Sequence, residues 1–177
     1  MSPSKTVRLH YYGLSLVEIE VLYSTLGESF EILEEESQVD DPEYVSMVKI
    51  EFPLPYNESF FQLFTIERWF KIKGIIKEIR RRRGRKGLKA FLCFCGISSE
   101  IKSHLIFSLM NKNDRQFEIG IEKIEYLVDI IPLQLGTLPT NTEEVIYSYD
   151  VASLKWRPHV ARSRGLDYFF KDNEWKK

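Results

Sequence analysis

The sequence is short of cysteine and has no long apolar stretch, and each shortage excludes a class of protein. Only two of the 177 residues are cysteine, too few for the disulfide framework of a small secreted domain. No segment approaches the roughly 20 apolar residues of a membrane-spanning helix, and residues 1–13 lack the apolar core of a signal peptide. We therefore expect a cytoplasmic protein in a reducing compartment, without a membrane partner.

Motifs that mark common active sites are missing as well. The chain has no Walker loop and no G-x-G-x-x-G, H-E-x-x-H or G-x-S-x-G segment. Cys93 and Cys95 lie two positions apart, whereas redox pairs use C-x-x-C and structural zinc sites use four ligands, so we interpret both as core residues. We expect no metal, no cofactor and no catalytic residue. A small nuclease built on His159 or on the acidic turn at Asp41 is the weaker alternative.

Charge is abundant but segregated along the chain, although the net charge is only −1. Residues 28–51 hold nine acidic residues and one lysine, whereas residues 71–89 hold ten basic residues and one glutamate. Such asymmetry indicates a charged partner. The alternative is that the two blocks face each other, within one chain or between copies.

The apolar pattern of the first 97 residues indicates alternating strands and helices. Ser15 and Glu18 have the spacing of a capping box and Gly27 stands where a helix would stop, which favours a helix although Val17, Ile19 and Val21 also alternate as in a strand. We expect strands over residues 6–13, 29–36, 43–55 and 88–97, and helices over residues 14–29 and 58–83, the second weakened at Gly74. The resulting order, βαββαβ, predicts an α+β fold with a ferredoxin-like antiparallel sheet and both helices on one face.

The remaining pattern predicts additions to that sheet. Residues 98–114 suggest a capped helix, and residues 115–136 suggest one long strand or two short ones. After residue 136 we expect a loop, one short element and an aromatic, basic tail. The predicted organisation is a core domain over residues 1–136 and an extension over residues 137–177 that packs on the core or on a partner.

The basic block ends in the run RRRRGRKG, which is the most unusual local chemistry of the sequence. Arginine has a fixed fork of donors that matches phosphate oxygens, so a helix end and turn of this kind suit a nucleic-acid backbone. The alternative is a solvated helix end that aids solubility. The predicted phosphate contacts from this block are Lys73, Lys77, Arg80, Arg82, Arg83, Arg85 and Lys86.

The C-terminal stretch interleaves cations with aromatic rings, a composition that suits single-stranded nucleic acid because bases stack on rings while cations hold the backbone. The predicted contributors here are Trp156, Arg157, Arg162 and Arg164. The same rings could instead dock the tail on the core or on a partner. The chain lacks the sheet motif of RNA-recognition domains.

The sequence thus favours a non-enzymatic module that binds the phosphate backbone of RNA or DNA, with RNA preferred. The alternative from another class is an assembly subunit, in which the acidic block of one copy meets the basic block of another and the aromatic arm joins a neighbour. A homo-oligomer or a larger protein assembly would follow from that alternative.

Overall fold

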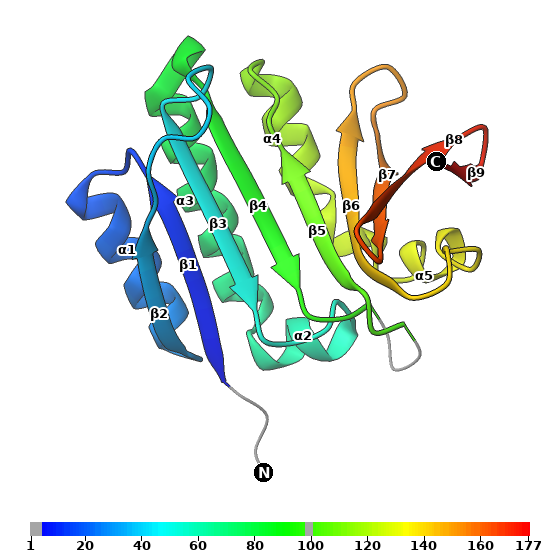
Figure 1. Cartoon of the computed structure of the whole chain (residues 1–177). Coiled ribbons are helices and arrows are strands. Elements are labelled where there is room, and N and C mark those ends of the chain that lie inside the picture. The colour runs from blue at the N-terminus through cyan, green and yellow to red at the C-terminus, as the bar shows by residue number, and fades with distance from the viewer. Residues whose placement is uncertain (1–4, 98–100) are drawn as a thin grey trace.

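The computed structural model describes residues 5–97 and 101–177, and its nine described strands form one mixed sheet (Figure 1). The strand order across the sheet is β2-β1-β3-β4-β5-β6-β7-β8-β9. The strands are Thr6–Tyr12 (β1), Glu31–Glu36 (β2), Ser46–Phe52 (β3), Leu88–Phe94 (β4), His104–Leu109 (β5), Thr142–Asp150 (β6), Lys155–Ser163 (β7), Leu166–Lys171 (β8) and Glu174–Lys176 (β9). The α-helices are Leu16–Gly27 (α1), Glu58–Leu63 (α2), Ile66–Arg83 (α3), Asp114–Glu122 (α4) and Ile131–Gln134 (α5), with 3-10 turns at Gly84–Lys86 (η1) and Ile124–Leu127 (η2).

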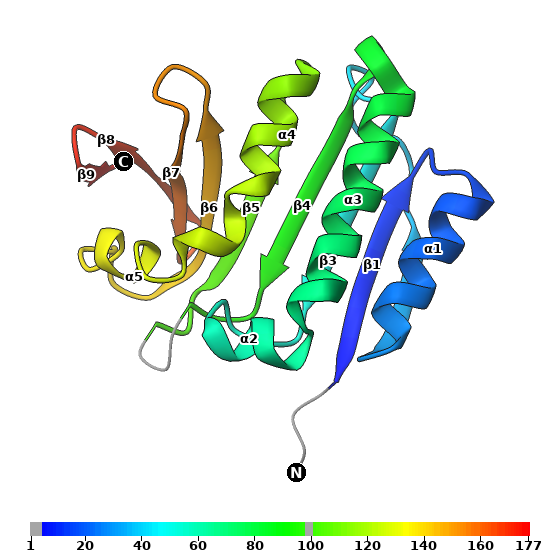
Figure 2. The ribbon, with the colours of Figure 1, turned by 180° about the vertical axis from the view of Figure 1, so that it is seen from behind.

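Three βαβ units make up most of the sheet. In each unit the two strands are parallel and directly adjacent: β1 with β2, β3 with β4, and β5 with β6. The units are joined by antiparallel pairs, and β7, β8 and β9 add an antiparallel meander at one edge. Helices α1, α3 and α4 all cover the same face (Figure 2), so the β5–α4–β6 crossover is left-handed whereas the other two are right-handed. Left-handed crossovers are rare among parallel strand pairs.

Local signals in the sequence explain where the helices begin and end. The capping box predicted at the start of α1 is confirmed, because the Ser15 hydroxyl accepts from the Glu18 amide and the Glu18 carboxylate accepts from the Ser15 amide. The helix predicted over residues 58–83 is two helices, and the break falls at Thr65, not at Gly74. Thr65 has a φ of 74° and its hydroxyl accepts from the Arg68 amide, so it ends one helix and caps the next.

The core lies between the sheet and its helices. Strands β1, β3, β4, β5 and β6 each turn alternate apolar side chains toward the helix layer, where most are fully buried. Aromatic rings dominate its centre, with Phe52 stacked on Phe94 at 5.3 Å and both rings in edge contact with Phe60. The opposite face of the sheet has no helix over it in the described chain (Figure 1). One packed face and one open face give the molecule two layers.

The prediction of a ferredoxin-like βαββαβ sheet is wrong, and the elements up to residue 97 follow the order β1, α1, β2, β3, α2, α3, η1 and β4. The ferredoxin-like fold splits each βαβ unit, so that another strand lies between the two strands that a helix connects. Here the connected strands are direct neighbours and run parallel. Residues 37–45 then carry the chain across β1 to start β3 on its far side.

The predictions for residues 98–136 and for the tail are also wrong. A strand, β5, lies where a helix was expected, and helices α4 and α5 lie where strands were expected; residues 98–100 of the expected helix lie outside the described residues. Ile101, Leu105 and Leu109 are four apart, a spacing that fits one face of a strand as well as one face of a helix. In place of a loop and tail, residues 142–176 form four strands of the sheet. None of the described helices has the length and apolarity that a membrane crossing requires.

Candidate functional site on the open face of the sheet

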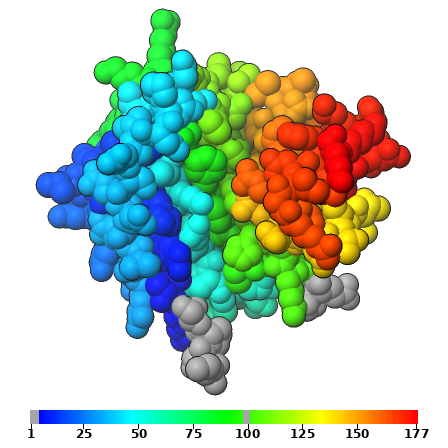
Figure 3. All heavy atoms as spheres, in the orientation of Figure 1, coloured from blue at the N-terminus to red at the C-terminus, as the bar shows by residue number. Residues whose placement is uncertain are grey.

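The open face of the sheet carries a groove of about 840 Å³, which we call the open-face groove. In Figure 3 its floor is visible between the cyan segment that follows β2 and the orange and red C-terminal strands. The polar and aromatic side chains that line it are Arg8, His10, Ser37, Gln38, Asp40, Lys49, Glu51, Lys89, Phe91, Ser108, Glu144, Ser148, His159 and Arg162. A smaller hollow of about 430 Å³ adjoins it and shares Arg8, Lys49, Glu51 and Glu144.

The strand register brings these residues together. Side chains alternate along a strand, so the residues between the core positions all point to the open face. One row across six strands is Arg8, Glu51, Cys93, Ile106, Ile146 and Val160, and the next row is His10, Lys49, Phe91, Ser108, Ser148 and Arg157. The groove therefore has charged groups toward its two sides and an apolar strip near its centre.

Most charges in the groove are held in pairs. Lys49 lies 3.2 Å from Glu51, Lys89 lies 2.6 Å from Asp40, and Arg162 lies 3.0 Å from Glu144. Burial works against the charge of Lys89, yet its bond to Asp40 and the nearby negative groups hold its pKa above the ordinary value. The same bond lowers the pKa of Asp40. Lys89 and Asp40 are therefore both charged at neutral pH.

Arg8 and Phe91 differ from the rest of the groove. Arg8 is exposed, and its guanidinium makes no hydrogen bond or ion pair within the described part of the chain. Phe91 is a half-buried aromatic ring on β4, two strands away from Arg8. Neighbouring strands are about 4.8 Å apart and Phe91 lies two residues along β4 from Cys93, the register position of Arg8, so the two Cα positions are roughly 12 Å from each other. An unpaired cation and an accessible ring thus share one surface.

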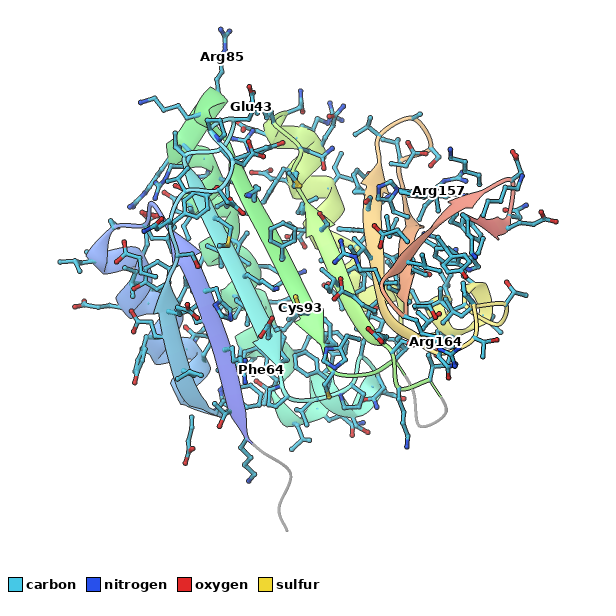
Figure 4. All side chains as sticks on the ribbon, viewed as in Figure 1. Glu43, Phe64, Arg85, Cys93, Arg157 and Arg164 are labelled. Carbon is cyan, nitrogen blue, oxygen red and sulfur yellow. The ribbon has the colours of Figure 1, made fainter. Side chains whose placement is uncertain are left out.

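The groove offers no activated nucleophile. Cys93 lies at the centre of the open face (Figure 4) and is buried, which raises the pKa of its thiol to about 12. The thiol is therefore neutral at physiological pH. Cys93 is buried as expected, but on the open face and outside the core cluster between the sheet and its helices. The interpretation of Cys95 as a core residue is wrong, because Cys95 is exposed, although partial burial still raises the pKa of its thiol. Among residues 5–97 and 101–177, no group of three or more His, Cys, Asp or Glu side chains is arranged to hold a metal ion.

The predicted phosphate contacts on α3 are in large part used inside the molecule. Lys73 is buried and its ammonium group lies 3.0 Å from Glu122 and 2.5 Å from Glu125. Lys77 also pairs with Glu122. Arg80 is buried; it donates to the backbone carbonyls of Gly84, Asn111 and Lys112 and lies 2.9 Å from Asp114. These three side chains join α3 to its neighbours.

The end of the arginine run contains one structural residue, Arg83, and three accessible cations, Arg82, Arg85 and Lys86, which we call the basic tip. Arg83 donates to both oxygens of Glu18 and to Ser46, which joins α3 to α1 and β3. Arg82 is half exposed and shares Glu78 with Arg81. Arg85 and Lys86 are exposed on η1, and Figure 4 shows Arg85 pointing away from the molecule. Of the predicted set on this block, Arg82, Arg85 and Lys86 are accessible.

The C-terminal residues have three different environments. Trp156 is buried and donates to the Gly120 carbonyl at 2.7 Å, so its ring packs in the core, which the docking alternative had anticipated. Arg162 lies in the open-face groove, between Glu144 and Asp167. Arg157 lies 3.4 Å from Asp150, and Arg164 is exposed beside Asn141.

Sequence reasoning missed most of the open-face groove. Arg8, Lys49, Lys89 and Phe91 were not singled out, although each occupies the non-core phase of a predicted strand. Alternation of polar and apolar residues would have placed them on one face. Only the strand order could place them side by side.

Comparisons of the chain with family models, with curated proteins and with solved structures find no match. The function is therefore inferred from side-chain geometry and charge.

Proposed function

We propose that the protein is a non-enzymatic module that binds single-stranded nucleic acid, RNA in preference to DNA, across the open face of its sheet. The observation that carries this proposal is that the unpaired guanidinium of Arg8 and the accessible ring of Phe91 line the same open-face groove. Open sheet faces that carry aromatic rings bind RNA by stacking bases on the rings while cations hold phosphates.

The chemistry of the groove suits such a ligand. Arg8 and Arg162 provide planar guanidinium groups at the two sides of the groove, which match phosphate oxygens. The carboxylates of Glu51 and Glu144 are acceptors for the amino groups of bases. With four Lys or Arg side chains against three acidic ones in its lining, the groove is nearly neutral. We therefore expect modest affinity with a shallow salt dependence, because few counterions are released.

The direct test is fluorescence anisotropy of labelled single-stranded RNA, single-stranded DNA and duplex RNA, titrated with the protein at several salt concentrations. Phe91→Leu keeps the apolar bulk but removes the flat ring, and stacking of one base accounts for about 1–3 kcal/mol, so binding should weaken roughly 5- to 150-fold. Arg8→Ala should flatten the slope of log affinity against log salt by about 0.7, the loss of one phosphate contact on a single strand.

The matched control is the pair Arg85→Ala and Lys86→Ala on the basic tip. Both side chains are exposed cations outside the open-face groove, so their removal should leave binding almost unchanged. If these variants weaken binding while Arg8→Ala and Phe91→Leu do not, the nucleic acid lies on the basic tip and the open-face assignment is wrong. Absence of binding at low salt would overturn the proposed function.

A further inference from the structure

Strand β2 is an edge strand of the sheet, and no strand of the described chain pairs with its outer side (Figure 1). The Glu31 amide donates to the Lys5 carbonyl, and the Ser37 amide donates to the Tyr11 carbonyl. Main-chain groups of successive residues point to opposite sides of a strand, so the odd-numbered residues of β2 bond to β1. The outward main-chain groups, which make no hydrogen bond within residues 5–97 and 101–177, are those of Ile32, Glu34 and Glu36.

The free edge of β2 lacks most of the features that block unwanted strand pairing. Natural proteins protect a sheet edge with a very short strand, lysine, proline, a β-bulge or a covering segment. β2 has six residues without proline or lysine, and its register with β1 runs without a shift from Glu31 to Glu36. Its remaining protection is negative charge. That charge repels a second acidic strand, such as β2 of another copy, but it attracts a basic one.

The charge of β2 has few partners inside the molecule. Four of its six residues are glutamates and none is basic. Glu35 lies 3.3 Å from His10, whereas Glu31 is exposed and forms no ion pair in the described part of the chain. Opposite charges that face each other on neighbouring strands stabilise their pairing. A strand added to this edge would therefore be stabilised by Lys or Arg side chains.

Helix α1 lies at the same edge of the sheet (Figures 1 and 2) and provides apolar contacts above it. Val17 and Val21 line the hollow between α1 and α3, so the helical period places Ile19 and Tyr23 on the side of α1 away from α3. Ile19 packs against the core, whereas Tyr23 is 47% exposed. On the open face of the sheet, Leu33 of β2 is 54% exposed. A strand paired with β2 would thus find apolar side chains on both of its faces.

We propose that the free edge of β2 binds an extended basic segment of a partner protein, which adds to the sheet as one more strand. Main-chain hydrogen bonds to the outward groups of β2 hold the segment, and side chains at alternate positions give the specificity. Its Lys or Arg side chains lie opposite Glu31 and Glu35 on the open face. Its apolar side chains lie on the helix side, against Ile32 and Tyr23.

The same observations disfavour other occupants. The main-chain groups of a helix are already bonded within the helix, so a helix cannot pair with the row of donors and acceptors on β2. A nucleic acid would bring its phosphates against the glutamates. An acyl chain would leave the outward main-chain groups without partners. The expected ligand is therefore a polypeptide strand in which basic and apolar residues alternate.

This inference goes beyond the proposed function and does not depend on it. The open-face groove holds the proposed nucleic-acid site, and no residue of β2 lines that groove. Binding of a basic peptide and binding of nucleic acid can therefore be measured separately.

The test is fluorescence anisotropy of a labelled peptide of four Lys-Val repeats, titrated with the whole chain at low salt. Glu31→Lys together with Glu35→Lys should weaken binding at least about 10-fold, because attractive cross-strand contacts become repulsive. Both side chains are exposed, so the variant should fold normally. The matched control is Glu143→Lys together with Glu174→Lys, which alters two exposed glutamates of β6 and β9 and should leave most of the affinity.

Methyl groups on alternate peptide nitrogens distinguish strand pairing from charge attraction. Only every second N–H of a strand points to its neighbour. Methylation of one alternate set should therefore abolish binding, and methylation of the other set should leave most of it. Amide hydrogen exchange gives a direct structural readout, because the Ile32 and Glu34 amides should become protected when the peptide binds. The Leu33 amide, which points to β1, should change little.

Three outcomes would overturn the proposal. One is absence of peptide binding at low salt. Another is binding that both methylated peptides retain, which would be charge attraction without strand pairing. The third is a dimer in sedimentation velocity whose Ile32 and Glu34 amides are protected without peptide, since a second copy of the chain would then occupy the edge.

Discussion

At the scale of single residues, burial decides what each cation of the arginine run does. A charge removed from water must be paired or hydrogen-bonded, and Arg80 meets that requirement with three carbonyl oxygens and one carboxylate. Arg85, five residues later, is exposed on a turn and remains hydrated. Two arginines of one run therefore differ in role, because Arg80 is a buried structural residue and Arg85 is an exposed cation.

Glu18 connects this ion-pair network to pH. Burial alone would raise the pKa of its carboxyl, but hydrogen bonds from Arg83 and Ser15 outweigh burial and hold the pKa below its ordinary value. A carboxyl whose pKa is lowered by folding stabilises the native state above the unfolded-state pKa, about 4.5, and loses that contribution as the pH falls through the folded pKa. Stability should therefore decrease as the pH drops below about 4.5.

Glu18→Gln should lower the free energy of unfolding at pH 7 by about 1–3 kcal/mol, since it leaves Arg83 without its carboxylate. The difference from the unaltered chain should shrink near pH 3, and urea unfolding monitored by circular dichroism at both pH values measures it. Glu36→Gln, at an exposed position at the end of β2, should change little. An equal loss at both pH values would contradict the ionic origin of the effect.

Residue types in the candidate site were easier to predict than their surroundings. The sequence indicated that Arg82, Arg85 and Lys86 would be accessible cations at a helix end, and they are accessible. It gave no sign that Lys73 would meet Glu122 and Glu125, because those acids lie about 50 residues away in a segment expected to be strand. Ion pairs between distant segments depend on topology, which local patterns do not contain.

At the scale of elements, local signals located six elements up to residue 97 but not their pairing. Capping residues and alternation act over a few positions, so β1, α1, β2, β3 and β4 fall where the pattern placed them, and α2 and α3 together fill the one helix predicted over residues 58–83. Whether β2 lies directly beside β1 or has another strand between them depends on the path of the segments that connect the strands. Here residues 37–45 carry the chain across β1 to β3. In β5 and α4 the spacing of apolar residues fits the period of a strand and also the period of a helix, and tertiary packing selects between the two.

Gly74 lies within α3 and Gly84 is its C-terminal cap. Together they distinguish the effect of backbone conformation from the effect of the space available for a side chain. A Cβ at Gly74 or at Gly84 would meet no atom within 4 Å, but Gly74 is helical whereas Gly84 has a φ of 54°. Gly74→Ala should therefore raise the free energy of unfolding by about 0.5–1 kcal/mol by limiting the unfolded chain.

Gly84→Ala should instead lower the free energy of unfolding by about 1 kcal/mol or more, because an L-residue is strained at this φ. Thermal and urea unfolding of both variants measure the pair of effects. Equal effects of the two substitutions would contradict the assignment of their difference to backbone conformation.

At the scale of the whole molecule, the sheet joins segments that the sequence suggested were separate. Strand β6 pairs with β5 through five residues of register, and Trp156 of β7 donates to Gly120 of α4. Tyr56, before α2, donates to the Ile124 carbonyl, so the first and second halves also meet within the helix layer. The result is a molecule with one face of its sheet covered by helices and one face open.

Such continuity predicts that the chain unfolds as one unit. In a Trp69→Phe variant the remaining tryptophans, Trp156 and Trp175, report on β7 and β9, while far-ultraviolet circular dichroism reports on the whole chain. Because β6 and β7 share the core with β5 and α4, both probes should give the same urea midpoint and slope, as two-state unfolding requires. A fluorescence transition at distinctly lower urea than the dichroism would mean that residues 137–177 unfold first. The division predicted at residue 136 would then be a boundary of cooperativity, even though no break interrupts the sheet there.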